Sequence, residues 1–182
     1  METIPTRVTD TTNDLLTREY SEVEIHEALS VMGSTKSPGP DGFNACFFQR
    51  YWHIVGKDVT SPVQSILTGG GLPPQLNRNH VVLIPKVNKP SQITEFRSIS
   101  LCNVLYKLVT KVISNKLKQL LLAIISETQS AFTPGRLITD NILIAYEVFH
   151  SMVSKKTRHG SMAIKVDMAK AYDRVEWLFL KR

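Results

Sequence analysis

The sequence predicts an α+β fold that is rich in helix and contains one β-hairpin and a single further strand. Three observations support this class. Apolar residues recur at helical spacing over most of the chain, two β-branched segments near the middle are typical of paired strands, and a short alternating segment near the carboxyl end is typical of one more. With 182 residues, of which 42% are apolar, the chain is long enough for one packed domain and too short for two large ones.

The first predicted element is a helix over residues 21–33. Residues 1–20, which precede it, are expected to be a disordered lead. Ser21 and Glu24 have the spacing of a capping box, and Gly33 is a typical helix end. The apolar face of this helix would consist of Ile25, Ala28, Leu29 and Met32.

Residues 37–42, Ser-Pro-Gly-Pro-Asp-Gly, are expected to form a rigid turn, because prolines fix φ and glycines permit conformations closed to other residues. Two short helices should follow, one ending at Gly56 and one at residues 69–71. Their apolar faces would be Phe47, Phe48, Tyr51, Trp52 and Val55 in the first and Val59, Val63, Ile66 and Leu67 in the second. The aromatic residues could form a base-stacking platform, but aromatics on one helical face are more often core, and we predict core.

A β-hairpin is predicted next. Its first strand would run through residues 81–84 to Pro85, and its second over residues 96–101, with a polar tip between them. Residues 103–121 return to helical spacing and should form an amphipathic helix. This helix is basic through Lys107, Lys111, Lys116 and Lys118.

Three further elements are expected after a loop at residues 133–135. A helix over residues 139–153 would turn an inner face of Ile142, Ala145, Phe149 and Met152 toward a core. Residues 162–166 alternate between apolar and polar or small side chains, which predicts a half-buried strand. From Ala169 onward the pattern is again helical.

Positive charge is concentrated in the later part of the chain. Residues 1–60 hold five Lys and Arg against nine Asp and Glu, whereas residues 61–182 hold seventeen against seven. A basic excess in one region suits a polyanion such as nucleic acid, because each neutralised phosphate releases counterions. A solvated basic surface that binds nothing specific is the alternative left open by charge alone.

Membrane insertion and disulfide bonding are not expected. The longest purely apolar run, residues 120–125, is far shorter than the roughly 20 residues that span a bilayer. The amino end has no secretory signal, and Cys46 and Cys102 are not closely spaced. We therefore expect an intracellular protein.

Asp167 is the strongest candidate for a catalytic group. It would stand at the end of the predicted strand, where a carboxylate is held rigidly yet remains exposed. Mg²⁺ prefers such oxygen ligands and usually takes one or two protein carboxylates. A strand-end Asp is also a common helix N-cap, so spacing alone leaves both roles open.

Four segments of the chain carry motifs in a fixed order, at residues 36–52, 83–107, 129–141 and 163–175. Together they resemble LINE-type (non-LTR) retrotransposon reverse transcriptases, especially those of plant genomes. Residues 36–43 are similar to the turn that leads into the fingers subdomain, and residues 47–52 are the matching segment that follows it. The segments at 83–86, 96–103 and 106–107 are similar to the fingers hairpin and the helix after it. Residues 129–136, with Asp140 and Asn141, form the third match, and residues 163–175 are similar to the family's motif A, which contains Asp167.

The resemblance implies the fingers and partial palm of a right-hand polymerase fold, truncated after the first catalytic aspartate. Residues 21–77 would be a helical N-terminal fingers segment, and residues 78–182 an incomplete reverse transcriptase domain. Such an enzyme would use an RNA template, a DNA primer and deoxynucleotide triphosphates, with two Mg²⁺ ions in the complete enzyme.

Residue roles follow from the same resemblance. Asp167 would bind both metal ions, and the backbone carbonyl of Met168 would help to hold one. Tyr172 would pack under the incoming deoxyribose and exclude a 2′-hydroxyl, although a core aromatic is the alternative. Lys86 and Arg97 would face the triphosphate, where they could neutralise charge on phosphate oxygens. Without the resemblance, each would be interpreted as a basic residue exposed to solvent.

Gln129 and Arg136 resemble template-strand contacts, presented by a loop that Pro134 and Gly135 shape.

Two departures from the family pattern bear on activity. Ser98 stands where the family usually has proline, which could shift Arg97. The sequence contains no adjacent pair of aspartates, although the family's two-metal site needs several carboxylates. We therefore expect the chain to be inactive alone. The alternatives are a non-catalytic basic nucleic-acid-binding module and a pseudogene product that does not fold stably.

Overall fold

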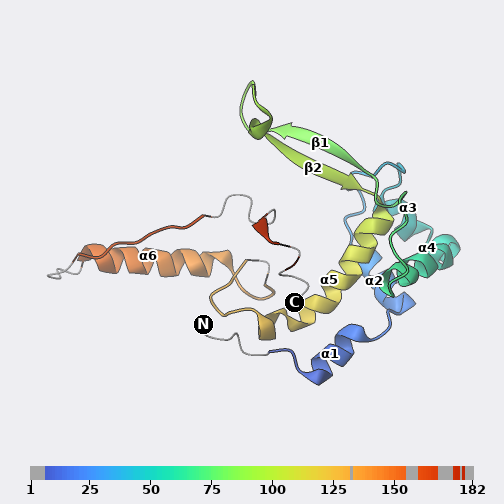
Figure 1. The fold of residues 1–182 in the computed structure, drawn as a ribbon, viewed down its shortest axis with the longest axis horizontal. Coiled ribbons are helices and arrows are strands. Elements are labelled where there is room, and N and C mark those ends of the chain that lie inside the picture. The colour runs from blue at the N-terminus through green and yellow to red at the C-terminus, as the bar shows by residue number, and fades with distance from the viewer. Residues whose placement is uncertain (1–6, 132, 155–159, 168–173, 177, 179–182) are drawn as a thin grey trace. The chain divides into compact units, whose positions relative to one another are not determined.

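A computed structural model describes residues 7–131, 133–154, 160–167, 174–176 and 178. The chain divides into two compact units, residues 1–127 and 128–182. In order, the first unit contains α1 (Asp10–Thr17), α2 (Glu22–Ser30), α3 (Ala45–Arg50), α4 (Trp52–Leu67), β1 (Asn79–Pro85), the 3₁₀ turn η1 (Ile93–Glu95), β2 (Phe96–Cys102) and α5 (Val104–Ile124) (Figure 1). The second unit contains α6 (Ile138–Ser154). The boundary predicted between residues 77 and 78 lies inside the first unit.

The described structure is helix-rich with one two-stranded antiparallel sheet, as the sequence predicted. β1 and β2 pair in register from Asn79 opposite Cys102 to Pro85 opposite Phe96. All seven residues of β1 are exposed to solvent. The hairpin is therefore held by its own backbone ladder and by its base, and neither of its faces is buried in the first unit.

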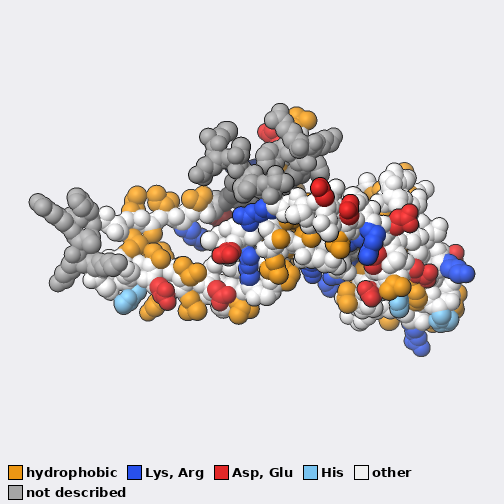
Figure 2. Space-filling model, turned by 90° about the horizontal axis from the view of Figure 1, so that it is seen from below, with side chains coloured by type: hydrophobic (Ala, Val, Ile, Leu, Met, Phe, Trp, Pro, Cys, Tyr) orange, Lys and Arg blue, Asp and Glu red, His pale blue; other side chains and the backbone are white. Residues whose placement is uncertain are grey.

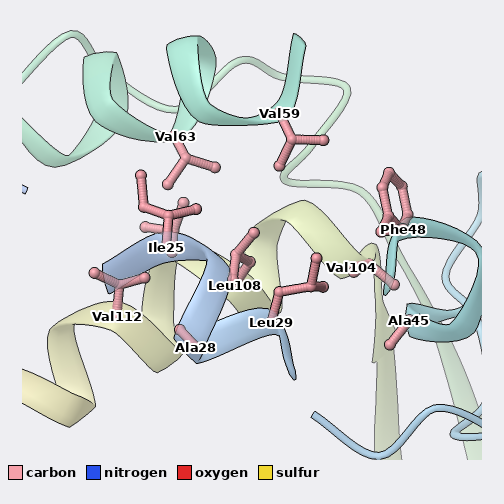
Figure 3. Packing of buried hydrophobic residues seen from close by; sticks show 11 residues of the cluster. Ile25, Ala28, Leu29, Ala45, Phe48, Val59, Val63, Val104, Leu108 and Val112 are labelled. Carbon is pink, nitrogen blue, oxygen red and sulfur yellow. The ribbon is translucent and has the colours of Figure 1, made fainter. Parts of the chain in front are cut away.

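The hydrophobic core of the first unit lies where α2, α3, α4 and α5 meet (Figure 3). Each helix contributes small or branched side chains at helical spacing, so the faces interlock. The buried residues are Ile25, Ala28 and Leu29 of α2, Ala45 and Phe48 of α3, Val59 and Val63 of α4, and Val104, Leu108, Val109 and Val112 of α5. The predicted faces of α2, α3 and α4 are confirmed, although Met32, Phe47 and Trp52 pack only at the edge and Tyr51 is exposed.

The break between the two predicted short helices was misplaced. α3 ends and α4 begins at Tyr51, and Gly56 lies buried inside α4. A Cβ at Gly56 would come within 3.0 Å of the Trp52 ring, so this glycine makes room for an aromatic one turn earlier. Close packing against Trp52 therefore explains why a glycine stands at position 56, which the sequence pattern had indicated as a helix end.

Three other expectations need correction. A capped helix, α1, stands within the predicted disordered lead, and the side chain of Thr9 accepts a hydrogen bond from the Thr12 N–H. The predicted inner face of α6 is not buried, and exposed apolar side chains are visible along this helix at the left of Figure 2. Residues 160–167 form no strand, because no described segment pairs with them. The helix predicted from Ala169 lies almost entirely outside the described residues.

The turn at residues 37–42 is docked onto the junction between β2 and α5. Gly39 is buried there, and an added Cβ would lie 2.6 Å from the carbonyl carbon of Cys102 and closer still to the backbone nitrogen and Oδ1 of Asn103. Asn103 is itself buried; its Oδ1 accepts from the Asp41 N–H at 3.3 Å, and its Nδ2 donates to the Gln75 carbonyl at 3.4 Å. One side chain thus joins three segments.

The connection between α1 and α2 is held by charged groups. Nζ of Lys116, a buried residue of α5, lies 3.6 Å from the centre of the Tyr20 ring and donates a hydrogen bond to the Arg18 carbonyl. Glu24 completes the capping box predicted for α2, because its carboxylate accepts from the Ser21 N–H at 2.8 Å. Arg18 forms an ion pair with the same carboxylate at 3.1 Å.

Gly39→Ala should destabilise the protein, because the new methyl group has no room beside the Asn103 backbone. Overpacking of this kind costs about 1 to 3 kcal/mol of unfolding free energy, which urea titration followed by circular dichroism would measure. Gly160→Ala is the control, since no atom lies within 4 Å of a Cβ at that position. Equal stability of the two variants would contradict the docking of the turn.

The stability of the first unit should fall in acid partly through Glu24. Burial by itself raises the pKa of this carboxyl, but hydrogen bonds from Ser21 and Arg18 and the charge of Lys116 outweigh it, so the pKa is lowered. A lowered folded-state pKa adds stability above the unfolded value of about 4.3, and this gain is lost as pH falls toward the folded value.

The unfolding free energy of Glu24→Gln should therefore lie below that of the native chain at neutral pH, and the two should converge in acid. Urea titrations at several pH values would measure this difference. Glu22→Gln, in the same first turn of α2, is the matched control for loss of one carboxylate. A difference for Glu24→Gln that does not change with pH would count against the capping box as the source.

Candidate functional site

The hairpin places Lys86 and Arg97 on one face. Arg97 lies opposite Ile84 in the ladder, and the Lys86 N–H extends the ladder by donating to the Glu95 carbonyl at 2.7 Å. Since side chains alternate along a strand, Lys86 shares the face of Ile84 and therefore of Arg97. Diagonal neighbours of this kind are about 7 to 8 Å apart, so two cations can approach one anionic group.

Both cations are exposed and lack an acidic partner within the described structure. The Glu95 carboxylate, at the hairpin tip, accepts hydrogen bonds from the Ser91 N–H at 2.6 Å and the Gln92 N–H at 3.0 Å. Lys86 Nζ donates to the Thr94 carbonyl at 2.9 Å, which leaves two of its three donors for a ligand. The hairpin therefore presents two cations that form no ion pair with a described carboxylate.

The base of the hairpin is fixed by the junction at Asn103. β2 ends at Cys102, and Asn103 leads directly into α5 while its side chain holds the turn at residues 37–42. Sequence reasoning missed this role. An Asn before a helix is typical of an N-cap, yet this side chain makes no capping hydrogen bond, and no local signal indicates which distant segment it contacts.

In the second unit, the loop at residues 129–136 brings Gln129 and Arg136 together. Arg136 Nη1 donates to the Gln129 carbonyl at 2.7 Å, and Gln129 Nε2 donates to the Ala131 carbonyl at 3.3 Å. Gly135 has a φ of 75°, a left-handed conformation that favours glycine, and it allows the Arg136 N–H to reach the Thr133 carbonyl. Arg136 therefore shapes the loop, and the side chain of Gln129 is exposed on it.

Asp167 is exposed in a segment without regular secondary structure. Among the residues that the structure describes, no group of three His, Cys, Asp or Glu side chains could hold a metal ion. A two-metal site needs several converging carboxylates, and the described residues do not supply such a set around Asp167. Met168 and Tyr172, the other residues predicted near Asp167, lie outside the described residues.

No described helix is both long and apolar enough to cross a membrane. Cys46 and Cys102 are free thiols.

Comparisons with known proteins agree with the sequence motifs. The model of the family described as reverse transcriptase (RNA-dependent DNA polymerase) matches residues 84–182. A transposon TX1 protein of Xenopus laevis, described as an uncharacterized 149 kDa protein, is 34% identical over 157 residues, which are 86% of this chain and 12% of that protein. A putative 115 kDa protein in type-1 retrotransposable element R1DM of Drosophila melanogaster is 24% identical over 156 residues, 85% of this chain and 15% of its own length. The chain thus spans a small part of each of these two relatives.

Proposed function

The chain belongs to the reverse transcriptase (RNA-dependent DNA polymerase) family, and from this premise we propose that it supplies the nucleotide-contacting and template-contacting surfaces of an RNA-directed DNA polymerase. The two retroelement relatives support an origin in a LINE-type element. The substrates would be an RNA template, a DNA primer and deoxynucleotide triphosphates.

The observation that carries this proposal is the pair Lys86 and Arg97 on one face of an exposed hairpin. Their shared face follows from the strand register, and neither has a carboxylate partner within the described residues. A guanidinium can bind phosphate oxygens through two parallel hydrogen bonds, and an ammonium adds a compact charge beside it. Among the proposed substrates, the nucleotide triphosphate carries the densest negative charge, so it suits a guanidinium and an ammonium group side by side.

In the same proposal, Gln129 contacts the template strand from a loop that Arg136 holds in shape. A side-chain amide can hydrogen-bond a sugar, a phosphate or a base edge, and the closed loop limits its freedom. Asp167 would contribute one carboxylate to a metal site that requires others in addition. Tyr172 would pack beneath the deoxyribose of the incoming nucleotide. The backbone carbonyl of Met168 would help Asp167 to hold one metal ion.

A second candidate, a non-catalytic module that binds nucleic acid, is favoured by one observation. Among the described residues, Asp167 belongs to no group of three His, Cys, Asp or Glu side chains that could hold a metal ion, whereas residues 61–182 carry seventeen Lys and Arg against seven Asp and Glu. Both candidates require nucleic-acid binding, and they differ in whether a nucleotide triphosphate is also bound.

Arg97→Ala should weaken binding of a deoxynucleotide triphosphate by roughly tenfold or more, because a charge-assisted hydrogen bond contributes about 1.5 to 3 kcal/mol. Equilibrium titration with a fluorescent nucleotide analogue would measure the change. Lys57→Ala, an exposed lysine of α4, is the matched control. If Arg97→Ala and Lys57→Ala bind the nucleotide as tightly as the native chain, the hairpin has no nucleotide role.

The 182-residue polypeptide should not extend a DNA primer on an RNA template, because its sequence has no adjacent pair of aspartates to join Asp167. A primer-extension assay with Mg²⁺ and all four nucleotides would test this. Extension by the native chain that Asp167→Ala abolishes would show that these residues form a complete catalytic site, contrary to the proposal.

A further inference from the structure

A pocket of about 450 Å³ lies beside the amino-terminal half of α5, within the first unit. Its walls include apolar side chains such as Met32 and Val104, and its charged residues are Lys36, Lys107 and Lys111. No Asp or Glu is among the residues that line it. The pocket therefore combines apolar side chains with three lysines. Val104 and Ala45, two of its apolar lining residues, are labelled in Figure 3.

The lysines of this pocket form no ion pair with a described carboxylate. Within the described ranges the one ion pair joins Arg18 and Glu24, so none of the three lysines has a carboxylate partner there. Lys107 Nζ donates to the Ser37 carbonyl at 3.0 Å, which uses one of its three donors. Lys107 and Lys111 are also one helical turn apart, a spacing at which like charges repel. An anion in the pocket would relieve this repulsion.

Apart from the Ser37 carbonyl, which accepts a hydrogen bond from Lys107, carbonyl groups near these lysines have another donor. The last carbonyl oxygens of α2 and of the residues after it lie near the pocket and could otherwise accept hydrogen bonds from the lysines. Gln49 Nε2 already donates to the Leu29 carbonyl at 2.8 Å and to the Met32 carbonyl at 2.9 Å. The lysines are therefore available for an external acceptor.

The shape of the basic surface indicates what kind of anion it would bind. Lys107, Lys111, Ser114 and Lys118 follow one another at intervals of four, three and four residues, so they lie on one side of α5. This row is about 16 Å long at 1.5 Å per residue. A single phosphate would fill only part of it, whereas a nucleic-acid strand offers a series of phosphates, which are about 3.4 Å apart along the axis of duplex DNA.

We infer that this pocket and the lysine row bind the phosphodiester backbone of a nucleic acid, separately from the hairpin. Lysine ammonium groups would pair with phosphate oxygens, and the Ser114 hydroxyl could donate to one of them. The inference rests on the proposed function, under which the strand is the RNA template. It adds a contact surface formed by α5 and the segment that contains Lys36.

The test is a titration of the full chain with a single-stranded RNA oligonucleotide that lacks a terminal phosphate, followed by fluorescence anisotropy at several salt concentrations. Loss of one phosphate contact lowers the slope of log K against log salt by about 0.7, which is about a fivefold loss of affinity at 0.1 M salt. Lys36→Ala and Lys111→Ala should each show this loss. Lys107 is left unchanged because it also holds the Ser37 carbonyl.

Two controls separate a binding role from a folding role. Lys57→Ala should leave both affinity and slope unchanged, and Lys111→Arg should keep them near the native values because the charge is retained. Thermal melts of all variants show whether the fold is intact.

The inference is overturned if the native chain does not bind the RNA, or if Lys36→Ala and Lys111→Ala bind it with native affinity and slope. It is also overturned if these two variants weaken binding of a nucleotide triphosphate and leave RNA binding unchanged, because the pocket would then hold a free triphosphate. Failure of the proposed function is seen separately, in the nucleotide titration of Arg97→Ala.

Discussion

The close approach of Gly39 to Asn103 is the contact on which the arrangement of the first unit depends. Asn103 stands where β2 ends and α5 begins, and its side chain reaches both the Asp41 N–H and the Gln75 carbonyl. Only a residue without a Cβ permits this approach. The hairpin, the long helix and the turn at residues 37–42 are therefore positioned by one buried polar group, which is costly to leave unpaired.

This junction separates two basic surfaces that are built differently. On one side, the hairpin carries Lys86 and Arg97 on an exposed face, in a geometry suited to a compact, highly charged phosphate group. On the other, α5 carries lysines at helical spacing beside a pocket, which suits an extended chain of phosphates. In the proposed function, the first surface serves the nucleotide and the second the template backbone. Gly39 and Asn103 matter to both, because Asn103 stands where the hairpin ends and α5 begins, and Gly39 packs against it.

Sequence patterns predicted most of the local structure of the first unit, because helical and strand periodicity arise from residues close together in the chain. The capping box of Ser21 and Glu24, the two strands of the hairpin and the apolar faces of α2 and α4 are of this kind. Gly56 was misread because its reason is a tertiary contact with Trp52. The role of Asn103 was missed because an Asn that caps a helix and an Asn that bonds distant segments look the same in the local sequence.

Other features could not be predicted because they depend on partners that a pattern does not reveal. Residues 162–166 alternate like a strand, but a strand needs a paired neighbour, and none is present among the described segments. The apolar residues of α6 predicted a buried face, yet they are exposed. The candidate site shows the same limit. Family motifs indicated Lys86, Arg97, Gln129 and Arg136, but only the structure showed that Lys36 lies beside Lys107 and Lys111.

The most direct test of the central claim, that the hairpin and α5 form the substrate-contacting surface of a reverse transcriptase, is photocrosslinking to an RNA template annealed to a DNA primer. Mass spectrometry would identify the crosslinked peptides, with a photoreactive nucleotide analogue in a parallel sample. We expect template crosslinks in α5 and in the segment that contains Lys36, and nucleotide crosslinks in β1 and β2. Crosslinks confined to α4, or equally distributed over all exposed helices, would contradict the claim.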